Sequence, residues 1–338
     1  MEGLLRVAIV GFGGIARSHY NAYCRLVAEG YPLRVVAVCD RHPERVFDEV
    51  TTNLGHKNTP LDPATHLFSS IDELIKGEDF DVADVCLPTN LHKEATIALL
   101  SAGKHVLCEK PMALSAEEAK EMLACAEASG SRLMVAHLTR FDPHNVYLRN
   151  ALHDGRFGKL RHLSLKRLSV YPDWSPIFKT FDVNGGCILD MQIHDIDIAA
   201  MLLGTPSAVS TLACDDLPYH QLVSTRFFYE DATVTIEEAW DNTRTSPFYQ
   251  GFKARFETAS VTSDGVTLTV FPHDGEPEVV DIPLVDGGEF YEEILAFCRA
   301  VRGEGEEGFL PPEDSYLNMR LVEATKESAA KNGAPVSL

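Results

Sequence analysis

The chain has 338 residues, enough for two domains with separate cores. Lys and Arg number 30 and Asp and Glu number 50, so the formal net charge is −20, which disfavours nucleic-acid partners. No apolar run approaches the roughly 20 residues of a membrane span, and the N-terminus lacks a cationic leader, so we expect a cytoplasmic protein without membrane partners. The eight cysteines form no C-x-x-C pair, which predicts reduced thiols rather than zinc ligands or disulfides.

Strand-like and helix-like segments alternate over residues 1–137. Continuous apolar runs predict strands buried on both faces, and each helical segment between them closes on a glycine. This alternation predicts a doubly wound α/β domain with a parallel sheet. The predicted strands are residues 5–11, 33–40, 82–89, 105–110 and 132–137, and the predicted helices are 16–30, 93–103 and 115–130.

After residue 137 the alternation of strands and helices gives way to successive β-rich runs, and we predict a second domain over residues 138–338. A helix at 146–158 precedes a strand at 160–170 that alternates as if one face met solvent. Turn residues then separate several β-rich runs, which predicts an antiparallel or mixed sheet. These runs are 208–216, 222–231, 232–241, 252–260, 266–272 and 278–284, and two helices follow at 289–303 and 311–333. The acidic segment 303–308 between those helices is expected to be a solvated loop.

A glycine-rich loop connects the first predicted strand with the first helix. Gly11, Gly13 and Ala16 form the pattern G-x-G-x-x-A, in which the first glycine makes a tight turn and the second lets the backbone approach a pyrophosphate. The small third residue permits close packing of helix and sheet, with phosphates at the helix N-terminus. The predicted cofactor-binding residues here are Gly11, Phe12, Gly13, Gly14, Ile15 and Ala16.

An acidic residue ends the second predicted strand at the position where a dinucleotide-binding fold holds a ribose. Asp40 lies 24 residues beyond Ala16 and would accept a hydrogen bond from the ribose 2′-hydroxyl, which favours NAD. Arg41 follows it and leaves an alternative open, because a guanidinium would neutralise a 2′-phosphate and admit NADP. Both residues are assigned to the cofactor site, with NAD preferred.

Two further predicted strands end in residues assigned to the same cofactor. In open α/β sheets, ligands bind outside the carboxyl ends of the strands. Glu109 and Lys110 occupy such an end, and Pro111 fixes the backbone after them, in a cis or a trans form that the sequence leaves open. Pro88, Thr89, Asn90 and His92 occupy another, where Asn90 and His92 would border the nicotinamide ribose.

Several motifs in order along the chain carry a resemblance to a known family. The glycine loop, "PTNLHKEA", "AGKHVLCEKPMALS", "NGGCILDMQIHDID" and the ending "ESAAKNGAPVSL" together resemble the Gfo/Idh/MocA oxidoreductases. This family includes glucose–fructose oxidoreductase and inositol dehydrogenases. The resemblance implies a Rossmann domain, then an α/β domain with a large open sheet, and homodimers or homotetramers. It also implies NAD(P)-dependent oxidation, or the reverse reduction, at a secondary hydroxyl of a sugar, sugar derivative or cyclitol.

The resemblance places the family's catalytic lysine, aspartate and histidine on Lys110, Asp190 and His194. Hydride transfer from a carbinol requires loss of the hydroxyl proton, and His194 is the natural base because imidazole has a reference pKa of about 6.5. The Lys110 ammonium would stabilise the developing alkoxide by its charge. Asp190 would orient the substrate hydroxyl or the imidazole.

Helical phase separates the acidic residues of "ILDMQIHDID". At about 100° per residue, Asp190, His194 and Asp197 share one face of a continuous helix, whereas Asp195 points away. We therefore expect Asp197 to be a buried hydrogen-bond partner and Asp195 to be solvated or in a subunit contact.

Two other sets of residues were weighed against these assignments. A zinc site could be formed by the side chains of Asp190, His194, His92 and Glu109. Each of them is already assigned to the proton chemistry or to the cofactor, so we expect no metal. Further residues have side chains that suit a sugar but more often serve the structure, and they stay outside the catalytic set: Arg140, Lys166, Arg167, Tyr171 and Trp174.

Two alternative functions share this fold. A catalytically silent NAD-binding regulator would have no need for Lys110 and His194. An NAD-dependent glycoside hydrolase would oxidise and re-reduce its sugar within one turnover and release an aglycone without net NADH.

Overall fold

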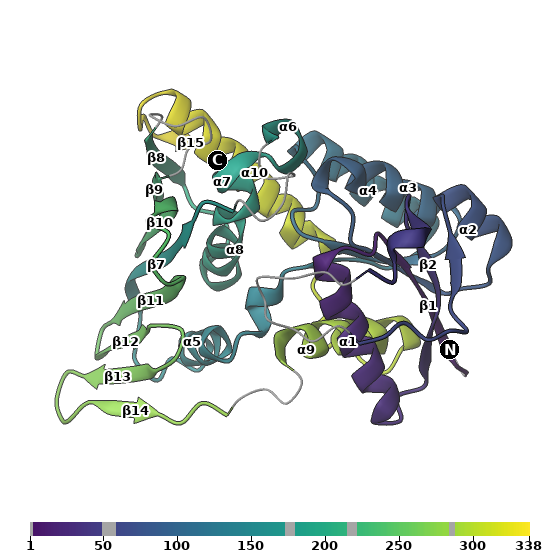
Figure 1. Cartoon of the computed structure of the whole chain (residues 1–338). Helices are drawn as coiled ribbons and strands as arrows, with labels where there is room; N and C mark the ends of the chain where they lie inside the picture. The colour runs from purple at the N-terminus through teal and green to yellow at the C-terminus, as the bar shows by residue number, and fades with distance from the viewer. Residues whose placement is uncertain (1–2, 49–58, 173–179, 215–221, 284–287) are drawn as a thin grey trace. The chain divides into compact units, whose positions relative to one another are not determined.

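The computed structural model describes residues 3–48, 59–172, 180–214, 222–283 and 288–338. The chain divides into two compact units, which Figure 1 shows in sequence colours. Unit 1 comprises Met1–Ala113, Glu117–Leu138 and Val285–Glu313, and unit 2 comprises Leu114–Ala116, Thr139–Leu284 and Asp314–Leu338.

Unit 1 is built on a parallel six-stranded sheet with the order β3-β2-β1-β4-β5-β6. This is the strand order of a dinucleotide-binding fold, with the order reversing between β1 and β4. The doubly wound parallel sheet predicted from the sequence is therefore confirmed. The strands are β1 (Leu5–Val10), β2 (Leu33–Cys39), β3 (His66–Phe68), β4 (Val82–Val85), β5 (His105–Glu109) and β6 (Leu133–Ala136). The sequence reading did not include β3 or the helix α2 (Ile71–Gly77) that follows it.

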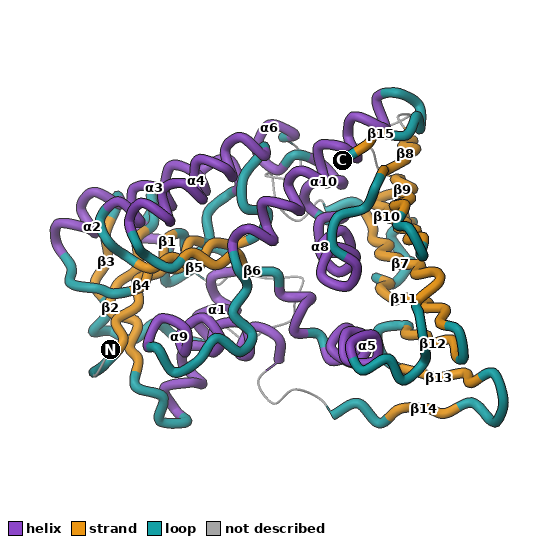
Figure 2. The backbone as a smooth tube through the Cα atoms, turned by 180° about the vertical axis from the view of Figure 1, so that it is seen from behind, coloured by secondary structure: helices purple, strands orange, loops and turns teal. Residues whose placement is uncertain are grey.

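Helices cover both faces of this sheet. Figures 1 and 2 show α1 (Gly14–Ala28) and α9 (Gly288–Arg302) on one face, and α2, α3 (His92–Ser101) and α4 (Ala116–Ser129) on the other. The predicted boundary at residue 137 assigns α9 to the second domain, whereas the structure packs it in unit 1, where the Arg25 guanidinium lies 5.2 Å from the Tyr291 ring centre. The periodicity of a helix indicates that one face is buried, but it does not indicate which sheet covers that face. The prediction assigned α9 to the second domain because it follows the strands of that domain in sequence.

Unit 2 contains a nine-stranded sheet with the order β14-β13-β12-β11-β7-β10-β9-β8-β15. Strands β7 and β10 pair in parallel and the other neighbours are antiparallel, as expected for a mostly antiparallel sheet. The predicted run 252–260 proved to be the end of one strand and the start of the next. The strands are β7 (Leu160–Val170), β8 (Ala208–Cys214), β9 (Leu222–Phe228), β10 (Thr233–Asn242), β11 (Tyr249–Phe256), β12 (Ala259–Ser263), β13 (Leu268–Pro272), β14 (Glu278–Val280) and β15 (Val336–Ser337).

One face of this sheet carries the apolar core of unit 2. Along β7, Leu163 and Leu165 are buried toward the helices, and His162 and Ser164 alternate with them toward the opposite face. Helix α8 packs on β7 and β10 and contacts α5, as Figure 2 shows. The helices of this unit are α5 (Pro143–His153), α6 (Phe181–Asn184), α7 (Gly186–Asp190), α8 (Gln192–Leu203) and α10 (Pro312–Ala330).

The single helix assumed for "ILDMQIHDID" is interrupted in the structure. Helix α7 ends at Asp190, Met191 has φ −105° and ψ −48°, and α8 begins at Gln192. Gly185 precedes α7 with φ +73°, and a Cβ there would overlap the Leu189 side chain, so this tight entry requires glycine. The phase argument for Asp190 and His194 assumed a continuity that the backbone does not have.

Candidate functional site

The glycine loop forms a cradle at the N-terminus of α1. Gly11 has φ +84°, and a Cβ there would lie 2.8 Å from the Cys86 carbonyl oxygen, so this position requires glycine. A Cβ on Gly13 would meet nothing within 4 Å, which leaves open space over the loop. Gly13 caps α1 without a side-chain hydrogen bond, and the first turn has no acidic residue. The positive end of the helix is therefore presented to an anion such as a pyrophosphate.

Asp40 is fastened beside this loop by two backbone hydrogen bonds. Its Oδ2 accepts the Phe12 N–H at 2.9 Å, and its Oδ1 accepts the His42 N–H at 2.8 Å. Each carboxylate oxygen has a second lone pair, so the group still accepts a hydroxyl proton. The exposed Arg41 follows it. A cradle for phosphates and a fixed carboxylate for a ribose fit a dinucleotide.

The ends of β4 and β5 are joined through His92. Its ring is buried, with Nδ1 2.8 Å from the Pro111 carbonyl oxygen and Nε2 2.7 Å from that of Leu87. Burial lowers the pKa of His92, and a neutral ring donates to one of the two carbonyls. The ring thus bridges the loops after β4 and β5, and its contact with a nicotinamide ribose stays a prediction. Thr89 and Asn90 lie in the short 3₁₀ helix before α3.

Lys110 directly follows β5, at the carboxyl end of the strand as predicted. The Lys110–Pro111 peptide bond is cis, which answers the question that the sequence left open. The Lys110 N–H donates to Glu109 Oε2 at 3.0 Å. The Glu109 carboxylate thus accepts the N–H of the next residue, and its assignment to the cofactor stays a prediction.

A buried polar cluster behind the loop was not predicted from the sequence. His19 of α1 lies 2.9 Å from Asp84 Oδ2 through Nδ1 and 2.9 Å from Glu109 Oε1 through Nε2. Cys86 Sγ lies 3.4 Å from Asp84 Oδ1. The available signal was Asp84, a carboxylate in the middle of an apolar strand, because a buried charge requires a partner.

The same cluster offers three donor atoms of the kind that hold a metal. One atom each from His19, Asp84 and Cys86 lies within 4.8 Å of the others. The two carboxylate contacts of the ring have the length of ordinary hydrogen bonds. Burial raises the pKa of the Cys86 thiol well above its usual range. The geometry is that of a charged hydrogen-bond network.

Asp190 and His194 both lie in unit 2, at the junction of α7 and α8. The His194 N–H donates to the carbonyl of Met191, the residue between the two helices, at 3.2 Å. Both side chains are half-buried. Met191 packs in a buried apolar cluster with Cys187 and Trp240, so packing stabilises the junction of the two helices.

Asp197 is the buried hydrogen-bond partner that helical phase predicts. Its carboxylate accepts from Arg140 Nε at 2.8 Å and Nη2 at 2.6 Å, and from Asn318 Nδ2 at 2.6 Å. Arg140 also donates to Asp314 at 2.7 Å. Arg140, a candidate substrate contact in the sequence, is thus a structural residue.

The expectation that Asp195 is solvated is wrong. Asp195 is buried and pairs with Arg167 at 3.0 Å, and Glu238 lies buried beside them. The helix carries buried residues on more than one side, since it is packed by β7, β10 and α5, and a phase argument with one buried face fails there.

The other candidate substrate contacts have structural neighbours. Lys166 pairs with Glu237 at 2.7 Å, and the Tyr171 ring packs edge-on against Trp240 with ring centres 6.1 Å apart. Trp174 lies outside the described residues.

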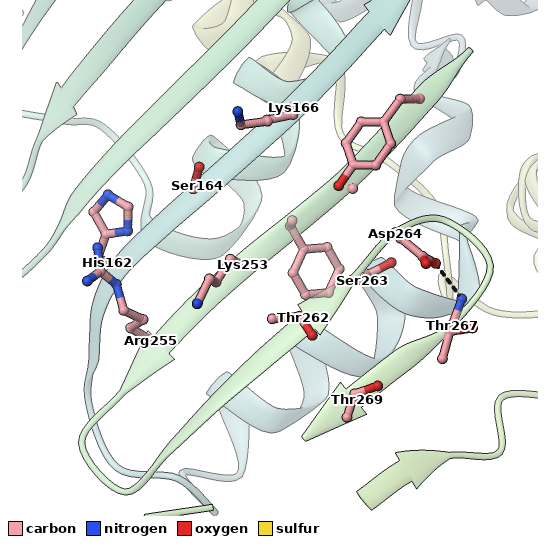
Figure 3. A pocket seen from close by; sticks show the side chains of 13 residues that line it. His162, Ser164, Lys166, Lys253, Arg255, Thr262, Ser263, Asp264, Thr267 and Thr269 are labelled. Carbon is pink, nitrogen blue, oxygen red and sulfur yellow. Dashed lines mark hydrogen bonds between the residues drawn. The ribbon is translucent and has the colours of Figure 1, made fainter. Parts of the chain in front are cut away.

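A cavity of about 590 Å³ lies on the other face of the unit 2 sheet, over β7, β11, β12 and β13. Figure 3 shows Lys166, Lys253, Arg255 and His162 among the polar side chains that line it. None of the predicted catalytic residues lines this cavity. It is a cationic hollow, and of the candidate substrate contacts that the structure describes only Lys166 lines it.

The strand order, the glycine cradle and the fixed Asp40 define a class of dinucleotide-binding protein. Residues 5–137 match the model of the oxidoreductase family with an NAD-binding Rossmann fold, and residues 146–271 match the GFO/IDH/MocA C-terminal domain. The two matched segments together cover more than half of the chain. The chain belongs to the Gfo/Idh/MocA family, as its motifs indicate.

Characterised relatives match the chain over nearly its whole length. The inositol 2-dehydrogenase of Rhizobium meliloti is 27% identical and covers 97% of both chains. The D-glucoside 3-dehydrogenase of Escherichia coli is 28% identical, covering 99% of this chain and 97% of the relative. The structure of the WlbA dehydrogenase from Bordetella pertussis with NADH and UDP-GlcNAcA has a TM-score of 0.83 at 19% identity, over 100% of this chain and 99% of that one.

Proposed function

We propose that this protein is an NAD-dependent dehydrogenase that acts on a secondary hydroxyl of a sugar, sugar derivative or cyclitol. The observation that carries the proposal is the dinucleotide cradle of unit 1, in a chain of this family. The named activities of the two enzyme relatives, an inositol and a glucoside dehydrogenase, support the substrate class. Bound NAD would supply the hydride acceptor, and the residues of this chain would bind the cofactor, orient the hydroxyl and remove its proton.

Three side chains carry the proton chemistry in this proposal. His194 takes the hydroxyl proton as general base. The Lys110 ammonium stabilises the negative charge that develops on the substrate oxygen, and Asp190 orients the hydroxyl or the imidazole. These roles follow the resemblance of the motifs. Lys110 follows β5 in unit 1, and His194 lies in α8 of unit 2.

NAD is preferred over NADP because Asp40 places a fixed negative charge beside the glycine loop. A 2′-phosphate would meet this carboxylate, while a 2′-hydroxyl would donate to it. Arg41 is exposed and keeps NADP as the alternative. The cofactor residues proposed are those of the loop, Asp40, Arg41, and the ends of β4 and β5.

The remaining assignments are proposed on family grounds. Unit 2 would bind the substrate and form a homodimer or homotetramer. A cytoplasmic location agrees with eight cysteines that are all free thiols in the structure. Among the described residues, no helix is long and apolar enough to cross a membrane. Sedimentation analysis measures the oligomeric state, and a monomer would contradict that part.

The direct test is a cofactor titration followed by a substrate panel. NADH and NADPH binding are measured by fluorescence, and then NAD reduction at 340 nm is followed with inositols, sugars and glycosides. We expect tighter binding of NADH and a steady absorbance increase with at least one polyol. Binding without reduction of NAD by any of them would contradict the proposal, and aglycone release without net NADH would indicate a glycoside hydrolase.

A further inference from the structure

The imidazole of His19 lies between two carboxylates inside unit 1. Nδ1 is 2.9 Å from Asp84 and Nε2 is 2.9 Å from Glu109, and the side chains of His19 and Asp84 have no exposed surface. A neutral imidazole donates from only one nitrogen. Both contacts are hydrogen bonds to ionised carboxylates only when the ring carries a proton on each nitrogen.

The surroundings of the ring agree with this charge. Burial by itself disfavours the charged ring, but the carboxylate of Asp84 outweighs it and raises the pKa of His19 well above its ordinary value. Burial likewise opposes ionisation of Glu109, yet His19 and then Lys110 hold the pKa of that carboxyl below its usual range. The ring of Phe290 packs against the imidazole with centres 5.4 Å apart, which helps to exclude water.

The second oxygen of Glu109 links the cluster to the next residue of the chain. Oε1 faces His19, and Oε2 accepts the Lys110 N–H at 3.0 Å. A carboxylate with one oxygen held by a buried cation has a fixed plane, so its other oxygen fixes the Lys110 amide. The connection starts in α1, the helix that begins at the glycine loop, and it ends at the backbone of Lys110.

We propose that His19 is a positioning residue for Lys110. Its imidazolium clamps Glu109, and Glu109 in turn orients the backbone from which the lysine side chain projects. The helix that receives the cofactor phosphates is thereby tied to the strand end that carries the lysine. The inference deepens the proposed function, since it rests on the role given there to Lys110.

The connection is first tested without any substrate. In His19→Asn the shorter amide no longer spans the two carboxylates and supplies no charge. We expect hydrogen–deuterium exchange of the Lys110 amide, read from peptides covering residues 106–113, to become about tenfold faster. Cys86→Ala is the matched control, because Cys86 contacts His19 and Asp84 but not Glu109. The control should exchange like the wild type.

The consequence for the reaction is tested with NAD and the polyol that reduces it in the substrate panel. We expect His19→Asn to lower kcat about 30-fold, while the NADH dissociation constant and the KM for NAD change less than about threefold. If the substitution only disturbed packing, thermal stability would fall, but kcat would not fall more than cofactor affinity does. Circular dichroism checks that each variant is folded.

Glu109→Ala provides a second route should His19→Asn fail to fold. This variant removes the acceptor of the Lys110 N–H, so exchange at that amide should rise by a similar factor. In the double variant His19→Asn/Glu109→Ala the effects should not add, because both substitutions break one connection.

Several outcomes would overturn the inference. Unchanged exchange at Lys110 in His19→Asn or in Glu109→Ala would do so, as would faster exchange with an unchanged kcat. Lys110→Ala separates the two proposals. If that variant keeps full activity, the role of Lys110 in the proposed function fails, whereas an inactive Lys110→Ala beside a fully active, folded His19→Asn refutes only the positioning role.

Discussion

At the scale of single residues, Glu238 shows how burial reverses the usual behaviour of a carboxyl group. It lies on β10 with no exposed surface, beside the buried Asp195. Burial, and then the charge of Asp195, raise the pKa of Glu238 well above its ordinary value, although Arg167 opposes this. The folded protein therefore holds a proton that the unfolded chain releases above about pH 4.5.

This proton makes stability depend on pH at Glu238. The folded state binds more protons than the unfolded state between the two pKa values, so the contribution of this group to stability falls as pH rises above the unfolded pKa. Glu238→Gln removes the group that titrates. From pH 5 to pH 8 we expect the stability of the variant to rise relative to that of the wild type, its free energy of unfolding gaining up to about 1.4 kcal/mol per pH unit. Urea unfolding at both pH values measures this, and a difference that stays constant with pH would refute it.

Asp40 lies beside the glycine loop, where the sequence predicts a carboxylate that binds the ribose. Its carboxylate holds the Phe12 N–H and keeps a free lone pair on each oxygen. We expect Asp40→Ser to weaken NADH binding about 10- to 100-fold, the value of a charged hydrogen bond, and to improve NADPH relative to NADH. Fluorescence titration gives both constants. Glu44→Gln, which removes an exposed charge nearby, is the control, and an unchanged preference in Asp40→Ser would contradict the assignment.

At the scale of elements, Asp197 ties α8 to the segments around it. It accepts from Arg140 in the short helix after β6 and from Asn318 in α10, so one carboxylate joins three segments distant in sequence. The neighbouring Asp195 does the same toward β7 through Arg167. Charged residues on a helix that is packed on several sides thus join it to neighbouring segments by buried ion pairs.

Removing the charge of Asp197 should therefore cost much stability. Asp197→Asn leaves the buried Arg140 without its main counter-charge, and such changes cost about 3–5 kcal/mol. We expect the free energy of unfolding to fall by that amount, with the midpoint of urea unfolding at a lower concentration. Asp231→Asn breaks the exposed pair with Lys159 and should leave the midpoint nearly unchanged. Equal effects of the two substitutions would mean that the buried Asp197–Arg140 pair stabilises the protein no more than the exposed Asp231–Lys159 pair does.

At the scale of the whole molecule, the chain leaves unit 1 near residue 138 and returns to it at Val285. The segment Val285–Glu313 supplies α9, whose Phe290 packs on His19 and whose Tyr291 meets Arg25. Unit 1 is therefore completed by residues almost 150 positions further along the chain. The glycine cradle, Asp40, the ends of β4 and β5, and Lys110 all belong to this unit.

Binding of the cofactor to this cradle should stabilise the folded protein. At an NADH concentration 100 times its dissociation constant, mass action adds about 2.7 kcal/mol to the free energy of unfolding. At that same concentration we expect a much smaller gain in Gly11→Ala, because its Cβ would press on the Cys86 carbonyl and distort the loop. Urea unfolding followed by circular dichroism, with and without NADH, tests this. An equal gain in both proteins would show that the loop does not hold the cofactor.

Sequence alone determined the parts of this protein that depend on local pattern. Buried parallel strands appear as continuous apolar runs, the glycine loop requires small residues at given spacing, and Lys110 follows a strand whose carboxyl end is a ligand-binding edge. These signals lie within a few neighbouring residues, so the Rossmann sheet, the cofactor loop and the family were all predictable.

Only the tertiary structure decided what depends on contacts between distant residues. The stretch "ILDMQIHDID" gave Asp197 a partner as expected, but the break at Met191 and the burial of Asp195 arise from packing against β7, β10 and α5. The position of α9, the contact of Glu109 with His19 and the protonated His19 likewise depend on neighbours far along the chain. Periodicity records that a side is buried, whereas the partner that compensates a buried charge is fixed by three-dimensional contact.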